Sequence, residues 1–83
     1  STEAVERYLF TTKTCPNCKI AKESLKNVDY QVIDAEENPE LTGKFGVMQA
    51  PTLVVVEGDT FQKYVNASNI KKYVDQVAGN AVE

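Results

Sequence analysis

Apolar and polar residues alternate along the chain in segments that have either the period of a strand or that of a helix. The clearest helical segment spans residues 68–78, where apolar side chains recur at spacings of three and four. These apolar positions are Ile70, Tyr73, Val74, Val77 and Ala78. We expect Gly79 to end this helix. The uninterrupted apolar run at 53–56 predicts a strand that is covered on both faces.

Turn and capping residues delimit the other predicted elements. In chain order these are a strand at 7–11, a helix at 16–27, a strand at 30–34, a helix that begins at Pro39 and buries Leu41 and Phe45, and a strand at 60–65. We expect Asn38 to cap the short helix and Gly46 to end it. A tight turn joins the last two strands into a hairpin, and Phe61, Lys63 and Val65 share one face of the second strand.

The predicted order of elements is therefore β-α-β-α-β-β-α, an α/β protein. Because a helix separates the first two strands, we expect them to be parallel and joined by a right-handed crossover. The last hairpin adds an antiparallel edge, so the sheet is four-stranded and mixed, with helices on both faces. A chain of 83 residues is expected to form one domain over 1–83, and its start at Ser1 is compatible with excision from a larger protein.

Charge and composition narrow the range of partners. The net charge is −3 and the sequence pI is about 4.9, which disfavours nucleic acid and anionic membranes. No apolar run approaches the ~20 residues of a membrane-spanning helix. No signal peptide precedes the domain, so we expect a cytoplasmic protein, and we expect it to be a monomer.

The chemistry of the chain is concentrated in Thr14-Cys15-Pro16-Asn17-Cys18-Lys19, which holds both cysteines. This stretch joins the first strand to the first helix, with Cys15 near the N-cap and Pro16 at the first helical position. Unpaired N–H groups and the helix dipole favour a thiolate there, so we expect Cys15 to be an ionised nucleophile. Cys18 lies in the first turn on the same side, within reach of Cys15 to form a disulfide. This spacing near a βαβ pattern is typical of a redox pair.

Two other interpretations of the cysteines have weaker support. A disulfide this short closes a tiny loop, so it would stabilise the fold very little. Zinc requires four ligands, usually Cys and His, and this chain has no His and no third Cys. We therefore expect no metal and no cofactor beyond the redox-active Cys15–Cys18 disulfide.

Two motifs together carry a resemblance to a known family. The first is Phe10-x-x-x-x-Cys15-Pro16-x-Cys18 followed by a lysine-rich helix, and the second is Met48-Gln49-Ala50-Pro51-Thr52 directly before the buried strand. At this separation they resemble the glutaredoxins and thioredoxin-like redoxins, over essentially the whole chain. The resemblance implies a thioredoxin-like fold of glutaredoxin size, with Pro51 in the cis form, and a dithiol–disulfide oxidoreductase.

The resemblance also implies roles for individual residues. Cys15 would attack a protein disulfide, and Cys18 would resolve the mixed disulfide. The residues that contact the substrate would be Pro16, Asn17, Ala50 and Pro51, with Lys13 and Lys19 as electrostatic support. Met48 is expected either to form a soft contact surface or to fill the core.

A narrower resemblance concerns the partner. Segments 11–19, 47–52 and 66–69 resemble the redoxin domains associated with anaerobic ribonucleotide reductase. This implies a ribonucleotide reductase as the protein disulfide substrate and an upstream reductase as the electron source.

Departures from the family pattern leave several points open. Leu9 stands where thioredoxins keep a buried acid, so no proton acceptor for Cys18 is evident. Thr12 stands where glutaredoxins have a lysine, with Lys13 one place later, and Asn66-Ala67-Ser68-Asn69 replaces their Gly-Gly-acid turn. The reductant is thus either glutathione or an enzyme of the thioredoxin-reductase type. Two alternative functions remain: a non-catalytic docking module of a larger enzyme, and an iron–sulfur cluster held between two chains.

Overall fold

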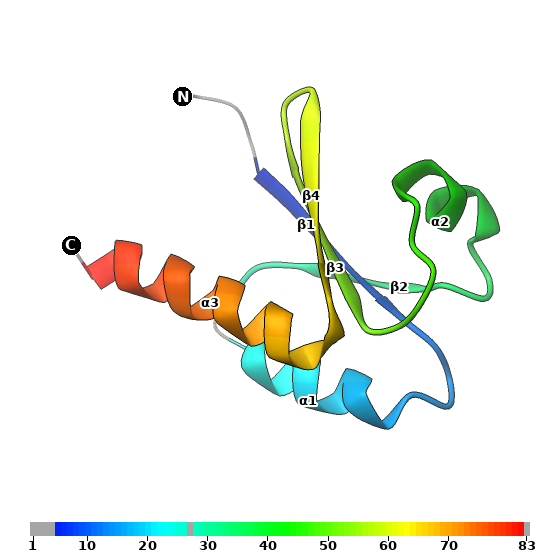
Figure 1. Cartoon of the computed structure of the whole chain (residues 1–83), viewed down its shortest axis with the longest axis horizontal. Helices are drawn as coiled ribbons and strands as arrows, with labels where there is room; N and C mark the ends of the chain where they lie inside the picture. Colours follow the sequence, from blue (N-terminus) through cyan, green and yellow to red (C-terminus); the bar gives the residue numbers. More distant parts are fainter. Residues whose placement is uncertain (1–4, 27, 83) are drawn as a thin grey trace.

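The fold alternates strands and helices in the predicted order (Figure 1). The computed structural model describes residues 5–26 and 28–82. The elements are β1 (Val5–Thr11), α1 (Pro16–Ser24), β2 (Gln31–Asp34), α2 (Pro39–Phe45), β3 (Thr52–Glu57), β4 (Thr60–Val65) and α3 (Asn66–Val82). Among these residues, no helix combines the length and the apolar character needed to cross a membrane.

The four strands form one mixed sheet in the order β2-β1-β3-β4. β1 and β2 are parallel, as predicted for strands joined through a helix, and β3 is antiparallel to both β1 and β4. β4 is the antiparallel edge that the hairpin prediction requires. Because β1 and β3 run in opposite directions, the carboxyl end of β1 lies beside the amino end of β3, with Phe10 opposite Thr52. This register decides which loops meet at the functional edge of the sheet.

Helices cover both faces of the sheet, as predicted (Figure 1). The helices α1 and α3 pack on one face over a buried cluster formed by Leu9, Ala21, Leu25, Leu53, Val55, Ile70 and Tyr73. The short helix α2 lies on the other face, over the smaller cluster of Phe10, Phe45 and Val54. Neighbouring residues of one strand contribute to opposite clusters, because side chains alternate across a strand. The apolar run in β3 is accordingly buried on both faces, as its sequence predicts.

Two helix ends differ from the predictions. The helix α1 ends at Ser24 with Leu25 as its C-cap, and residue 27, where we predicted its end, lies outside the described residues. The prediction that Gly79 ends the last helix is wrong, since α3 continues through it to Val82. A glycine inside a helix costs only about 1 kcal/mol relative to alanine. It ends a helix where the chain takes up a left-handed conformation, and Gly79 does not do so.

The capping of α2 is confirmed at one end and altered at the other. Asn38 occupies the N-cap position, but its side chain makes no capping hydrogen bond and instead donates to the carbonyl oxygen of Asp34 at 2.9 Å. At the other end, Gly46 ends the helix in the left-handed conformation at φ 65°, as predicted. Lys63 of β4 donates from its ammonium to the Gly46 carbonyl at 3.0 Å, so this turn also ties α2 to the edge strand.

We predict opposite stability changes from alanine at the two glycines of this region. The substitution Gly46→Ala should lower the free energy of unfolding by about 1–2 kcal/mol, because a Cβ disfavours the left-handed conformation. The matched control, Gly43→Ala, lies within α2 with nothing within 4 Å of the added Cβ, and should raise it by up to about 1 kcal/mol. Urea unfolding of the two variants measures both changes. Equal midpoints for Gly46→Ala and the parent chain would contradict this account of how α2 ends.

Candidate active site at the start of α1

The two cysteines lie at the beginning of α1, joined to each other by a disulfide bond. Cys15 is the N-cap, with an extended backbone at φ −115° and ψ 98°, and Pro16 follows at the first helical position. The Cα atoms of Cys15 and Cys18 are 5.3 Å apart. The local sequence explains this geometry, because proline at the first helical position lacks an N–H that would have no partner there.

The sulfur of Cys15 receives a hydrogen bond from the helix start. The backbone N–H of Cys18 donates to Cys15 Sγ at 3.1 Å and also points to the Cys15 carbonyl oxygen at 3.3 Å. No acidic residue lies in the first turn of α1. The field at this sulfur is therefore that of the positive end of the helix dipole with an N–H group directed at it, and both favour negative charge on sulfur.

The two cysteines differ in how far they are buried. Cys18 is 3% exposed and shares the inner face of α1 with Ala21 and Leu25, which are fully buried against the sheet. Cys15 is only half-buried, at the end of the helix that faces solvent. An external disulfide can thus approach Cys15, while Cys18 faces the interior. Pro16 and Asn17 between them are exposed and border the accessible side of the disulfide.

The two lysines of the predicted site make no contact that ties them to sulfur. The Lys13 ammonium lies 3.6 Å from the Glu37 carboxylate, and both side chains are largely exposed. Lys19 is exposed on α1. An exposed ion pair of this kind contributes little to stability. Lys13 is thus directed toward the loop between β2 and α2 rather than toward the cysteines.

The loop 47–51 lies at the same edge of the sheet as the disulfide. The peptide bond between Ala50 and Pro51 is cis. Continuing the register of β1 and β3 places Ala50 opposite Thr12, in the loop that leads to Cys15. Two hydrogen bonds hold this segment: Thr52 Oγ1 donates to the Gln49 carbonyl at 2.6 Å, and the Asn66 N–H donates to the Pro51 carbonyl at 3.0 Å. The structure therefore brings the Ala50–Pro51 pair to the active-site edge.

A shallow hollow of about 200 Å³, which no pattern in the sequence predicts, opens beside Ala50. It is lined by Thr12, Ala35, Glu36, Thr42, Val47, Met48, Gln49 and Ala50. Met48 is 93% exposed, so of its two predicted roles the core-filling one is wrong. The sequence carried one signal for the turn that holds Glu36: Asp34 is the last residue of a strand, and aspartate there commonly accepts from backbone N–H groups two and three residues on.

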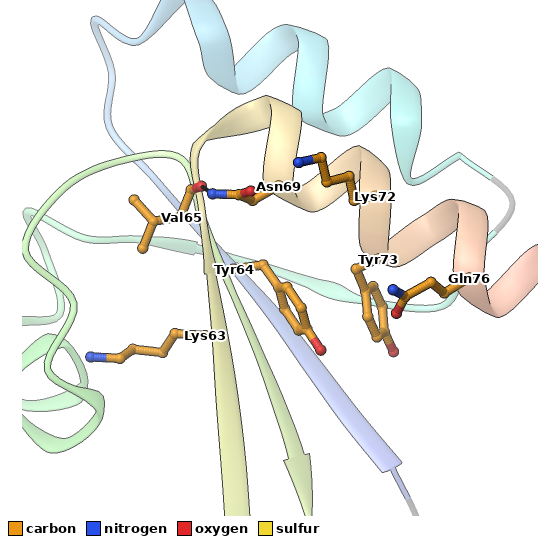
Figure 2. A pocket seen from close by; sticks show the side chains of 7 residues that line it. All are labelled: Lys63, Tyr64, Val65, Asn69, Lys72, Tyr73 and Gln76. Carbon is orange, nitrogen blue, oxygen red and sulfur yellow. Dashed lines mark hydrogen bonds between the residues drawn. The ribbon is translucent and has the colours of Figure 1, made fainter.

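A second hollow, of about 330 Å³, lies between β4 and α3 (Figure 2). Its main feature is the pair Tyr64 and Tyr73, whose ring centroids are 4.7 Å apart and whose hydroxyls point the same way (Figure 2). Arg7 Nε donates to the Tyr73 hydroxyl at 2.9 Å and so ties α3 to β1. Neither cysteine lines this hollow, and its aromatic walls belong to the packing of α3 against the sheet.

Among the described residues, no buried carboxylate is present to exchange a proton with Cys18. Leu9 of β1, at the position where thioredoxins keep their acid, is fully buried. In the part of the chain that the structure describes, the buried polar side chains are those of Thr11 and Thr52. Within residues 5–26 and 28–82, no group of three or more His, Cys, Asp or Glu side chains is placed to hold a metal ion.

The chain is similar to proteins of a known redox family. A family model described as Glutaredoxin matches residues 8–61. A thioredoxin of Methanocaldococcus jannaschii is 29% identical over 77 residues, which is 83% of this chain and 87% of that protein. A thioredoxin of Bacillus subtilis is 36% identical over 56 residues, which is 58% of this chain and 54% of that protein.

Solved structures of low identity show the same fold. The germline-specific thioredoxin Deadhead of Drosophila melanogaster has a TM-score of 0.78 at 20% identity, covering 94% of this chain and 82% of its own. A thioredoxin of Trypanosoma brucei brucei has a TM-score of 0.75 at 18% identity, covering 95% and 76%. The predicted thioredoxin-like fold is confirmed by these neighbours and by the order of the four strands.

We predict that the loop 47–51 depends on the buried hydroxyl of Thr52. The substitution Thr52→Val keeps the shape of the side chain but leaves the Gln49 carbonyl without this donor, so it should lower the free energy of unfolding by about 1 kcal/mol or more. A matched control is Thr60→Val, which removes a hydroxyl donating to the carbonyl three residues earlier in an exposed turn. The control should change stability by less than about 0.5 kcal/mol. Denaturant unfolding measures the free energy of unfolding of both variants. Equal losses of stability would show that the buried hydrogen bond contributes no more than the exposed one.

Proposed function

The chain belongs to the glutaredoxin family and is a thiol–disulfide oxidoreductase, and we propose that Cys15 is its attacking thiol and Cys18 its resolving thiol. The observation that carries this assignment is the unequal environment of the two sulfurs. Cys15 is accessible and accepts the Cys18 N–H, whereas Cys18 is 3% exposed on the inner face of α1. An incoming disulfide therefore meets Cys15 first.

The proposed reaction transfers two electrons from the reduced protein to a protein disulfide. The Cys15 thiolate attacks one substrate sulfur, a mixed disulfide forms, and the second substrate sulfur leaves as a thiolate that takes a proton from solvent. Cys18 then gives up its proton and attacks Cys15 Sγ. The bond between Cys15 and the substrate breaks, the substrate leaves as a dithiol, and the Cys15–Cys18 disulfide forms. Two electrons from an upstream reductant return the protein to its dithiol form.

We assign the substrate-contacting surface to residues on both sides of the disulfide. Pro16 and Asn17 are exposed at the helix start, and half-buried Ala50 lies across from the loop that leads to Cys15. The side chain of Pro51 is fully buried, so Pro51 contributes by holding the Ala50 backbone in place rather than by side-chain contact with the substrate. An extended segment of the substrate pairs with the backbone of Ala50, as extended peptides pair with exposed sheet edges in other proteins. The charge of Lys19 interacts at long range with charged groups of the partner protein. Lys13 contributes as part of its ion pair with Glu37 and not as an isolated charge.

We propose that the reductant is a protein reductase rather than glutathione. The Lys13 ammonium is paired with Glu37, and the Asn69 side chain donates to the Val65 carbonyl at 2.7 Å. Both groups lie in the segments that differ from the glutathione-binding pattern, and both are engaged within the chain. The proposed substrate is the disulfide of a ribonucleotide reductase, a choice supported by the resemblance of three sequence segments. A reducing cytoplasm is the matching location for such a dithiol, and we propose that the protein acts there as a monomer.

Cysteine variants separate the proposed roles. With Cys15→Ser, reduction of a protein disulfide should fall at least about a thousandfold, because the nucleophile is lost. With Cys18→Ser, a mixed disulfide between Cys15 and the substrate should accumulate, since nothing resolves it. Stopped reactions analysed by mass spectrometry measure the adduct. A Cys15→Ser protein with parent activity, or an adduct on Cys18 in preference to Cys15, would contradict the assignment.

The proposed partner is tested with an anaerobic ribonucleotide reductase whose disulfide has been formed by turnover. The reduced protein should restore its activity in a second round, and the oxidised protein should not. The double variant Cys15→Ser with Cys18→Ser is the control, and it also tests the docking-module alternative. If that variant supports full activity of the parent assembly, the cysteines are dispensable and the redox proposal fails there.

A further inference from the structure

The hollow beside Ala50 carries a charge that the reaction described above does not use. Glu36 lines this hollow together with the hydroxyl-bearing residues Thr12 and Thr42. Among the described residues, the one ion pair at this edge joins Lys13 to Glu37, and Glu36 takes part in none. The hollow thus presents an exposed carboxylate with polar neighbours next to the active-site loop.

The position of Glu36 is held by the end of the sheet. The Ala35 N–H donates to the Thr11 carbonyl at 2.8 Å, which ties the end of β2 to the end of β1. One carboxylate oxygen of Asp34 accepts the N–H groups of Glu36 and Glu37 at 2.8 and 3.2 Å. The backbone that carries Glu36 is therefore held on both sides, and its exposed side chain extends from a fixed point beside the hollow.

The hollow lies within reach of a substrate at Cys15. Thr12 is in its wall, three residues before Cys15, and three residues span at most about 10–11 Å. Ala50 also lines the hollow and belongs to the backbone proposed to pair with the substrate. Met48, another lining residue, is exposed and offers a flexible apolar contact. A side chain two or three residues from the attacked cysteine is thus able to enter the hollow.

We propose that the hollow selects protein disulfides in which a lysine or arginine lies two or three residues from the attacked cysteine. This rests on the proposed function, because it concerns the substrate of the same Cys15. A cationic side chain pairs with Glu36, its polar head lies near Thr12 and Thr42, and its methylene groups lie along Met48. An acidic substrate side chain in the hollow is disfavoured by repulsion, since residues 34–40 carry the four acids Asp34, Glu36, Glu37 and Glu40.

The test uses the reduced protein and short peptides closed by a disulfide. Each peptide carries Arg, Gln or Glu two residues from a cysteine, in one series on the amino side and in another on the carboxyl side. We expect the second-order rate constant to fall in the order Arg, Gln, Glu in at least one series. Because Glu36 is exposed, each step should be about two- to fivefold at low salt and should shrink at high salt.

Three variants provide the comparison, of which Glu36→Gln and Glu40→Gln change the charge by the same amount. With Glu36→Gln the advantage of Arg over Gln should be lost, and with Glu36→Lys the order should reverse. Glu40→Gln is the matched control, because Glu40 lies in the first turn of α2 outside the hollow, and it should keep the preference.

The outcomes are distinguishable from those that bear on the oxidoreductase. Equal rates for Arg, Gln and Glu peptides in both series would overturn this inference alone. An Arg preference that Glu36→Gln leaves unchanged would overturn it as well, by placing the selectivity elsewhere. Reduction of no peptide at all would overturn the proposed function and the selectivity with it.

Discussion

The hydrogen bond from the Cys18 N–H to Cys15 Sγ is the interaction on which the chemistry of this protein depends. It exists because Cys15 caps α1, so its sulfur lies where the first backbone N–H groups of a helix have no carbonyl partners. The same geometry buries Cys18 on the face of α1 that packs against the sheet. The start of α1 thus leaves Cys15 Sγ accessible and stabilises its anionic form, and it keeps Cys18 buried directly beside Cys15.

The sheet places a substrate surface around that sulfur. β1 carries the cysteine loop at its carboxyl end, and the antiparallel register brings the start of β3, with Ala50 and Pro51, to the same edge. The end of β2 is tied to the end of β1 and adds Glu36. Three segments far apart in sequence therefore meet at one edge, while the buried clusters on the two faces hold α1, α3 and α2 in place. Figure 1 shows α1 and α3 on one side of the sheet and α2 on the other.

Most of the fold could be predicted from the sequence, because strong local signals agree with one another. The apolar run in β3 favours a buried strand and the stripe on α3 an amphipathic helix, and the turn residues that flank each segment agree. The ends of helices were harder to predict. Gly46 and Gly79 look alike in sequence, but only Gly46 takes up a left-handed conformation, and the tertiary bond from Lys63 that accompanies it is invisible locally. Asn38 likewise gives its side chain to Asp34 because the preceding turn is already formed.

The candidate site divides in the same way. The cysteine pair could be found from its spacing, and Pro51 from the family resemblance, which implies a cis proline directly before the buried strand. Glu36 could not be found, because its relevance comes from the pairing of β2 with β1 and of β1 with β3. Lys13 was expected to act on the cysteines, and its engagement with Glu37 depends on the position of a loop more than twenty residues away. Long-range register, rather than local propensity, decides what surrounds the disulfide.

The most direct measurement is a titration of the two thiols in the reduced protein, followed by the ultraviolet absorbance of the thiolate and by the rate of alkylation at Cys15. Cys18→Ser serves to isolate the signal of Cys15, since its backbone N–H is retained. The account predicts that Cys15 ionises at a clearly lower pH than free cysteine, whose pKa is about 8.5. It also predicts that Cys15 is alkylated before Cys18. A Cys15 that ionises together with free cysteine, or a Cys18 that reacts first, would contradict it.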